Sequence, residues 1–360
     1  MCKIFGVDIG NSDSKTVSEN GAFSLKNIIS PGRERRLYED EKGAYADYLD
    51  VTIESKGVPL GRFFVGDLAL REGGQYTREK HMGSLKAENT DTYVLLLVSI
   101  ALSLFDPANP VKTEYINLGS GLPTEEFYSE GTLEKFKNRV KGTHKVKFNH
   151  PVFNDAEITL IVKDMAAIPE GSAAMINHLY DSEGAVIEDK AELARRLTLT
   201  VDIGAITTDI SAVENNRSVG TICFGLEKGI YHALDEIIED IARDYGGYRL
   251  SRHRLMQCLT LEGGKIPYKK QTIDGTAYAK YRYEQLAEDI SRKLVNRLNR
   301  EKPNIQDEVY TTFVVGGGAL ALSEYLPKFL KDYQLEFTED PIYANARGYF
   351  KVAKSLLEKV

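Results

Sequence analysis

The stretch that decides the fold is Lys3–Lys15, KIFGVDIGNSDSK, which recurs in outline at Thr198–Ile210 as TLTVDIGAITTDI. Each copy has an apolar run, then Val-Asp-Ile-Gly, then small polar residues that lead into a second extended run. Apolar runs bounded by Gly, Asn and Ser are typical of a strand, a tight turn and a returning strand. The sequence therefore predicts two similar strand–turn–strand units, with Gly10 and Gly204 at equivalent positions.

A second pair of glycine-rich segments follows at nearly the same spacing. Tyr115–Gly121 reads YINLGSG, and Phe313–Gly318 reads FVVGGG. Two matched pairs in one order indicate an internal duplication, in which each copy ends strands in glycine-rich turns.

Helix candidates alternate with these strands, which predicts an α/β fold. They are Asp91–Phe105, Thr124–Val140, Gly171–Leu179, Glu227–Tyr245, Tyr281–Arg300 and Arg347–Leu357. We expect a first domain of residues 1–165 plus 340–360 with an inserted subdomain at about 31–85. The second domain would be residues 166–339, with an inserted subdomain at about 245–300.

Composition excludes several classes of protein. The 360 residues carry 46 Lys and Arg against 53 Asp and Glu, a net charge of −7, which argues against a broad nucleic-acid surface. The three cysteines lie far apart with no CxxC, which indicates a reducing compartment. The apolar stretch Tyr93–Phe105 is shorter than the ~20 residues of a membrane helix and predicts a buried helix. We expect a cytoplasmic protein without a membrane partner.

The paired turns are suited to binding phosphate. Glycine turns let backbone N–H groups converge on an anion, so Gly10–Ser12 and Gly204–Thr208 predict two cradles. Asp8 and Asp202 precede them and would repel phosphate unless a cation intervenes. Mg²⁺ fits, because it keeps several waters and few carboxylates. The structural alternative is a pair of tight hairpins in which each Asp forms an Asx-turn.

In their order along the chain, the two VDIG turns, YINLGSGLP and the late VVGGGA resemble the actin-like ATPase superfamily, in its bacterial plasmid-segregation branch, ParM or StbA. The resemblance implies a duplicated actin-like fold of the ribonuclease-H-like kind, with two domains, a nucleotide cleft between them and an inserted subdomain in each. It also implies a nucleoside triphosphatase that uses ATP and Mg²⁺, with GTP left open.

The resemblance assigns three nucleotide-binding motifs. The first phosphate motif comprises Asp8, Gly10, Asn11, Ser12 and Lys15. The second comprises Asp202, Gly204, Thr207 and Thr208, and the nucleoside motif comprises Gly316, Gly317 and Gly318. Asp8 and Asp202 would hold Mg²⁺ through water. Gly119 and Gly121 fall in the first connecting segment, and Ala344–Tyr349 forms the second.

Hydrolysis of a γ-phosphate needs a group that orients the attacking water. In the superfamily this group follows the strand before the second phosphate motif. The predicted strand Ile158–Ala167 makes Glu170 the candidate, and Asp164 stays open as the alternative. The alternative is that Glu170 has only a structural role, as an acid in the first turn of a helix, where its negative charge interacts favourably with the helix dipole.

Three features extend the resemblance or depart from it. The family has two successive glycines in the second phosphate turn, whereas this chain has Ala205, which disfavours positive φ and predicts a different turn shape. The basic residues Arg249, Arg252 and Arg254 are interpreted as a solvated helix face or as a border of the base. The tyrosines of the first insertion are interpreted as contacts to a next subunit or as core residues; they are Tyr38, Tyr45, Tyr48 and Tyr76.

The leading functional hypothesis is a nucleotide-dependent filament protein. Head-to-tail contacts do not close, so they generate a helical filament, which hydrolysis would weaken. By resemblance, the filament would separate plasmid copies and reach DNA only through a small centromere-binding adaptor. The alternatives are a small-molecule kinase of the same superfold and a nucleotide-gated chaperone-like factor.

Overall fold

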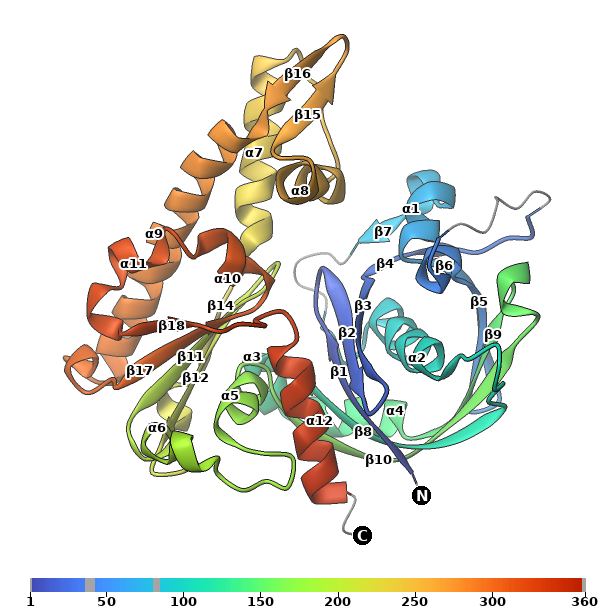
Figure 1. Ribbon diagram of the computed structural model, residues 1–360, viewed down its shortest axis with the longest axis horizontal. Helices are drawn as coiled ribbons and strands as arrows, with labels where there is room; N and C mark the ends of the chain where they lie inside the picture. The colour runs from blue at the N-terminus through green and yellow to red at the C-terminus, as the bar shows by residue number, and fades with distance from the viewer. Residues whose placement is uncertain (1, 36–42, 80–84, 358–360) are drawn as a thin grey trace. The chain divides into compact units, whose positions relative to one another are not determined.

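The computed structural model describes residues 2–35, 43–79 and 85–357, and the chain divides into two compact units (Figure 1). Unit 1 comprises Met1–Ala191 and Ile342–Val360, and unit 2 comprises Glu192–Pro341. Each unit contains a sheet with helices packed against it. The α/β class predicted from the sequence is confirmed.

A curved mixed sheet forms the framework of unit 1. Over the described residues its strands, in spatial order, are β3 (Gly21–Lys26), β2 (Asp13–Ser18), β1 (Lys3–Ile9), β8 (Thr113–Leu122), β10 (Glu157–Pro169), β9 (Gly142–Phe148), β5 (Asp50–Ser55), β6 (Val58–Val65), β4 (Ile28–Pro31) and β7 (Arg78–Glu79). Strand β1 pairs antiparallel with β2 and parallel with β8. The strand–turn–strand unit predicted for the first VDIG motif is therefore confirmed.

Helices cover both faces of this sheet. They are α1 (Asp67–Glu72), α2 (Thr90–Leu104), α3 (Thr124–Tyr128), α4 (Thr132–Val140), α5 (Ser172–Leu179) and α12 (Ala344–Leu357). Helix α2 packs against β1 and β2 on the concave face, and α12 packs against β1, β8 and α5 on the opposite face (Figure 1). The predicted buried helix is confirmed, since α2 is buried along most of its length. Over the described chain, none of the helices combines the length and apolar character that a membrane crossing requires.

The segment predicted as one helix, Thr124–Val140, is two. Helix α3 ends where Ser129 N–H bonds back to Glu126, and α4 begins after Gly131, whose φ is 73°. A residue in the left-handed backbone conformation cannot continue a right-handed helix. Glycine adopts this conformation without a steric penalty. The amphipathic pattern spans both pieces, which is why the sequence shows no break.

Glycines let α12 approach the sheet at backbone distance. A Cβ on Gly119 would lie 1.9 Å from the carbonyl oxygen of Tyr349, and one on Gly6 would lie 2.1 Å from that of Ala346. A Cβ on Gly348 would lie 1.8 Å from the carbonyl oxygen of Ala173 in α5. Side chains cannot be accommodated at such separations, so these glycines fix where α12 crosses the unit 1 sheet.

The sheet of unit 2 repeats the central arrangement. Its strands, within the described residues, are in the order β13 (Arg217–Ser218), β12 (Thr208–Glu214), β11 (Thr198–Ile203), β17 (Thr311–Val315) and β18 (Leu335–Phe337), and β14 (Phe224–Leu226) pairs with β12. Strand β11 is antiparallel to β12 and parallel to β17, as β1 is to β2 and β8. In both parallel strand pairs, the residues that face each other are separated by the same number of positions along the chain. Lys3 of β1 faces Ile116 of β8, and Thr198 of β11 faces Thr311 of β17. The predicted duplication is confirmed.

The glycine-rich segments after the two VDIG motifs are not equivalent in this register. Gly119 lies within β8 and faces Gly6, whereas Gly316 follows the end of β17, beyond the pair of Asp202 with Val315. When Asp8 is aligned with Asp202 and the strand registers are followed, the residue of β8 that corresponds to Gly316 is Leu122. The prediction that both segments end their strands in a turn is therefore wrong for the first one, whose glycines serve the contact with α12.

Unit 2 carries α7 (Ile230–Asp244), α8 (Arg252–Leu261), α9 (Gly275–Glu301), α10 (Gly317–Leu322), α11 (Leu326–Phe329) and the hairpin of β15 (Lys265–Tyr268) with β16 (Gln271–Asp274). The short helix α6 (Ala191–Arg195) lies where the two units join along the chain. Helix α9 begins before the predicted Tyr281, because the side chain of Asp274 accepts a hydrogen bond from Thr276 N at 3.0 Å and caps it.

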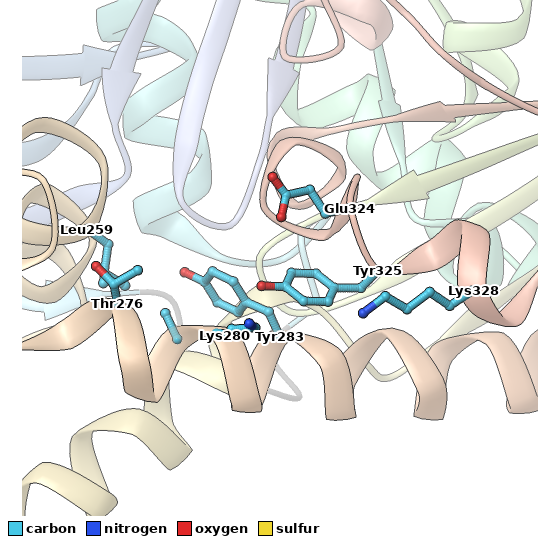
Figure 2. A pocket seen from close by; sticks show the side chains of 8 residues that line it. Leu259, Thr276, Lys280, Tyr283, Glu324, Tyr325 and Lys328 are labelled. Carbon is cyan, nitrogen blue, oxygen red and sulfur yellow. The ribbon is translucent and has the colours of Figure 1, made fainter.

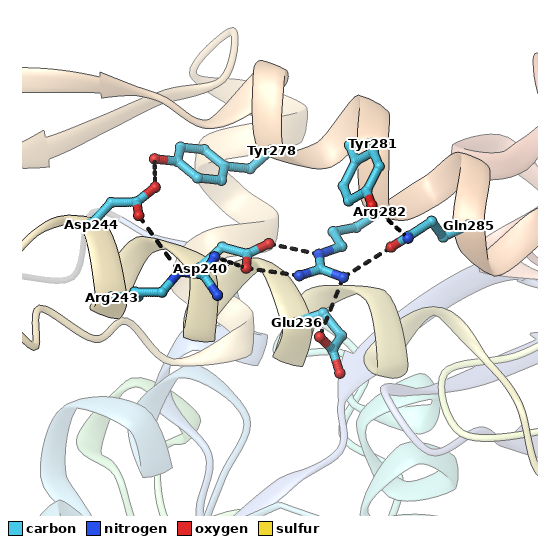
Figure 3. A network of polar contacts seen from close by, with 8 residues as sticks. All are labelled: Glu236, Asp240, Arg243, Asp244, Tyr278, Tyr281, Arg282 and Gln285. Atoms are coloured by element: carbon cyan, nitrogen blue, oxygen red, sulfur yellow. Dashed lines mark hydrogen bonds and ion pairs between the residues drawn. The ribbon is translucent and has the colours of Figure 1, made fainter.

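A charged network joins α7 to α9 (Figure 3). The guanidinium of Arg282 donates two hydrogen bonds to Asp240, at 2.6 and 2.7 Å, and Arg243 donates to the same carboxylate. Hydrogen bonding from Arg282 lowers the pKa of Asp240. Tyr278 donates to Asp244 at 2.7 Å one turn further along. Bidentate pairs have a fixed geometry, so this network sets the packing of the two helices.

Candidate functional site

The turn between β1 and β2 is closed by one side chain. Asn27 donates from Nδ2 to the carbonyl oxygen of Gly10 at 2.7 Å, and its backbone N–H donates to that of Ser12 at 2.8 Å. A Cβ on Gly10 would lie 2.6 Å from the carbonyl oxygen of Asp13 and 2.7 Å from Nζ of Lys15. Glycine is therefore required, and the ammonium group of Lys15 lies against the turn backbone, where both could meet an anion.

A buried group of charges lies in the same unit as this turn. Glu170 directly follows β10, and its backbone N–H donates to the carbonyl oxygen of Leu122 at 2.9 Å. Its carboxylate forms an ion pair with Lys86 Nζ, and the two side chains are only 9% and 2% exposed. Asp8, in β1, is also buried and interacts electrostatically with Lys86.

Lys86 keeps its charge in this setting. Burial lowers the pKa of Lys86, and the carboxylates of Glu170, Asp8 and Glu126 raise it; the carboxylates prevail and the pKa is raised. The side chain is therefore an ammonium ion at neutral pH. The sequence analysis missed this residue, because a single lysine before a helix carries no periodic or motif signal.

Asp164, the alternative to Glu170, occupies a different environment. It lies within β10 at a register shift, its side chain is 52% exposed, and Lys141 Nζ donates to it at 2.8 Å. The hydrogen bond from Lys141 lowers the pKa of Asp164. Glu170 lies six positions further along the chain, about 20 Å in an extended conformation. Thus Glu170, and not Asp164, is in the buried group with Lys86.

The turn between β11 and β12 is held by its own backbone and by α7. Gly204 N donates to the carbonyl oxygen of Thr207 at 2.9 Å, and Ile230 N donates to that of Gly204 at 3.1 Å. Tyr231 N donates to the carbonyl oxygen of Ala205 at 2.8 Å. The backbone at Ala205 does not have positive φ, so alanine fits this turn without strain.

Threonine side chains fix the far side of the same turn. Thr207 Oγ1 donates to Asp209 at 3.2 Å, and Thr208 Oγ1 donates to the carbonyl oxygen of Lys228 at 2.7 Å. Asp202 and Asp209 face each other across the strand pair. The turn therefore presents backbone groups on a rigid frame, with carboxylates beside it.

The segment Gly316–Gly318, which caps and begins α10, lies against the end of β11. Gly316 has a φ of 89°, and a Cβ there would lie 2.4 Å from Oδ1 of Asp202. A Cβ on Gly318 would lie 2.5 Å from Cγ2 of Ile203, whereas one on Gly317 would meet nothing within 4 Å. Unit 2 thus brings its predicted phosphate and nucleoside motifs together, with open space at Gly317.

The residue types suit a cation held through water. Asp8 and Asp202 offer carboxylate oxygens, the hard ligands that Mg²⁺ prefers, and Mg²⁺ retains several of its waters in proteins. In residues 2–35, 43–79 and 85–357 no three or more His, Cys, Asp or Glu side chains gather as a metal site.

Unit 2 also has a pocket of about 480 Å³ that the sequence did not predict (Figure 2). Its lining includes Tyr283 and Lys280 of α9, and Tyr325, next to α11. Burial, with Tyr325 nearby, raises the pKa of Tyr283 to about 12. Lys328 faces the same space and donates to Glu284 at 2.7 Å. The pocket depends on contacts between distant helices, so no local pattern signals it.

The three arginines of the second insertion are each paired with a carboxylate. Arg249 donates two hydrogen bonds to Glu239, at 2.6 and 2.7 Å, and Arg252 donates two to Asp235 at the same distances. Arg254 pairs with Glu262. Arg252 and Arg254 lie in α8, and Arg249 precedes it. Both interpretations of the three arginines, a solvated helix face and a border of the base, stay predictions.

The tyrosines of the first insertion differ in environment. Tyr48 is buried in the core of unit 1, and Tyr45 packs edge-on against Phe105 with ring centroids 4.9 Å apart. Tyr76 is exposed, and Tyr38 lies outside the described residues. Tyr48 is therefore a core residue, and Tyr76, 65% exposed, is more exposed than Tyr45, which is 37% exposed.

Comparison with protein families identifies the class. Residues 6–172 match the N-terminal domain of actin-like proteins. Residues 200–328 match the C-terminal domain of the archaeal MreB-like actin homologues. The chain belongs to the actin-like protein superfamily. No curated protein matches the sequence significantly.

Solved structures match over nearly the whole chain. A 15-stranded ParM filament from Clostridium botulinum has a TM-score of 0.77 at 20% identity and covers 99% of this chain and 99% of its own. The archaeal actin homologue Ta0583 scores 0.76 at 18% identity, covering 98% and 99%. Bacillus thuringiensis ParM with AMPPNP scores 0.71 at 17% identity, covering 100% and 99%. This likeness confirms the predicted actin-like fold.

Proposed function

We propose that this protein binds and hydrolyses ATP with Mg²⁺ and assembles into head-to-tail filaments. The carrying observation is the duplicated strand–turn–strand frame, in which Asp8 and Asp202 each stand two residues before a turn glycine. Two relatives support the proposal, since one was solved with AMPPNP and another as a filament. We also propose that units 1 and 2 correspond to the two predicted domains, each with its insertion, with the boundary after Ala191 in place of residue 165.

The turns would bind the phosphates through backbone N–H groups. Gly10, Asn11 and Ser12 form the first cradle, with Lys15 as a point charge, and Gly204, Thr207 and Thr208 form the second. The start of α10, with Gly316, Gly317 and Gly318, would lie against the nucleoside, since glycine permits close approach. Asp8 and Asp202 would hold Mg²⁺ through water, and the ion would neutralise charge on the phosphates.

Glu170 would orient the attacking water and accept its proton. The water oxygen bonds to the γ-phosphorus while the bond from that phosphorus to the β–γ bridging oxygen breaks, which gives ADP, inorganic phosphate and one released proton. Glu170 is buried at the end of β10 and pairs with Lys86, which also interacts with Asp8. This position favours Glu170 over the exposed Asp164.

The biological role that we propose is DNA segregation. The filament would push plasmid copies apart in the cytoplasm, linked to DNA by a small centromere-binding adaptor. The net charge of −7 agrees with an indirect link, because direct binding to the phosphate backbone uses a basic surface.

The direct test adds nucleotide to the purified protein. ATP with Mg²⁺ should raise light scattering, and negative-stain electron microscopy should show filaments that shorten as phosphate is released. AMPPNP should give filaments that persist. A solution that stays clear and consumes ATP only with a small acceptor molecule would favour a kinase and contradict the proposal.

Replacing Asp8 or Asp202 with Ala should weaken Mg²⁺-dependent ATP binding. A water-mediated partner contributes about 10- to 100-fold in metal affinity, so a loss of that size is expected. Titration with a fluorescent ATP analogue, with and without EDTA, measures it. Asp332→Ala, an exposed aspartate of unit 2, is the matched control and should bind as the wild type does. Wild-type affinity in Asp8→Ala and Asp202→Ala would remove both from the cation site.

A further inference from the structure

We propose that Lys86 is a positioning residue for the hydrolytic carboxylate, acting on the reaction through Glu170; this inference rests on the proposed function. The ammonium of Lys86 bonds to Oε1 of Glu170, and both side chains are almost fully buried. A carboxylate that orients water must be held in one rotamer, because small displacements of a catalytic group cost much of the rate. The ion pair supplies that restraint.

The segment that carries Lys86 is itself anchored. Glu126, in α3, accepts hydrogen bonds from two successive backbone N–H groups, Lys86 N at 3.0 Å and Ala87 N at 3.3 Å. Arg139, in α4, donates to the carbonyl oxygen of Ala87 at 3.4 Å. Asn89 then caps α2 by accepting from Thr92 N at 2.9 Å. Lys86 therefore approaches Glu170 from a fixed backbone.

The charge balance gives Lys86 a second reason to be present. Its ammonium interacts with three carboxylates, those of Glu170, Asp8 and Glu126. Ionised carboxylates that are buried close together repel one another, and an ammonium ion among them offsets that repulsion. Removing this cation while leaving the carboxylates would disturb the group that activates water.

The ion pair of Lys86 with Glu170 could position the carboxylate or could only stabilise the fold. A double-mutant cycle distinguishes these two roles. The variants are Lys86→Met, Glu170→Gln and the double variant, each measured for single-turnover phosphate release and for ATP affinity. Lys86→Met should slow release by on the order of 10- to 100-fold with ATP affinity little changed. In the Glu170→Gln background, Lys86→Met should cause no further slowing.

Two additional variants sharpen the cycle. Lys86→Arg keeps the positive charge and should restore part of the rate that Lys86→Met loses. Lys141→Met removes the exposed ion pair with Asp164 in the same unit and should hydrolyse ATP as the wild type does. Should Lys86→Met fail to fold, Glu126→Gln takes its place: it loosens the anchor of Lys86, and its smaller slowing should also vanish in the Glu170→Gln background.

The outcomes are distinct. Wild-type turnover in Lys86→Met, or equal slowing by this change in both backgrounds, overturns the role of Lys86 and leaves that of Glu170 intact. Wild-type turnover in Glu170→Gln overturns both roles. A wild-type protein that neither binds nor hydrolyses ATP contradicts the proposed function itself.

Discussion

Glu170→Gln is expected to slow ATP hydrolysis by about 10²- to 10⁴-fold, the range that a proton-accepting side chain contributes. Glutamine has the same shape but cannot take the proton of the attacking water. ATP binding should persist, because the backbone turns that would hold the phosphates are unchanged. Filaments should therefore form and last longer than those of the wild type. Phosphate release and the decay of light scattering after ATP is exhausted measure the two effects.

Asp164→Asn is the control for this result. Asp164 forms an exposed ion pair on the same strand, so its loss should leave turnover unchanged. Exposed pairs contribute about 0–1 kcal/mol to stability, so the fold should be retained as well. Slow turnover in Asp164→Asn together with normal turnover in Glu170→Gln would exchange the two assignments.

Gly119→Ala is expected to destabilise unit 1 by roughly 3 kcal/mol, the upper part of the range for inserting an atom into a packed core. The new Cβ would lie 1.9 Å from the carbonyl oxygen of Tyr349, so α12 or the sheet must move. For a unit of this size the unfolding midpoint should fall by about 6–12 °C. Thermal unfolding followed by circular dichroism or calorimetry tests this expectation.

Gly220→Ala makes a matched comparison for the glycine variant. A Cβ on Gly220 would meet no atom within 4 Å, and its backbone does not have positive φ. Its unfolding midpoint should remain within about a degree or two of the wild type, as for surface substitutions in general. Equal destabilisation in both variants would show that the crossing of α12 is not the cause.

Much of the fold follows from local sequence. The two VDIG motifs predict the strand–turn–strand units, because apolar runs that end in Gly and small polar residues restrict the chain to few conformations. The break at Gly131 and the start of α9 were missed, since a single residue in the left-handed region and one capping Asp decide them.

The residues of the candidate site divide along the same line. Glu170 could be proposed from its place after a predicted strand. Lys86 could not, because only tertiary structure brings it to Glu170 from a segment 84 residues away. The opposite error occurred at Gly119, where a glycine that packs against α12 was interpreted as part of a turn. Glycine serves both purposes, and the sequence does not distinguish them.

The crossing of α12 over β1 and β8 has a consequence for synthesis on the ribosome. Unit 1 is assembled from Met1–Ala191 and Ile342–Val360, so its glycine-lined sheet face is translated long before the helix that covers it. Unit 2 emerges in one continuous piece and can fold as soon as it leaves the exit tunnel. The unit that starts first is thus completed last, and until then a bare apolar surface must be kept from aggregating.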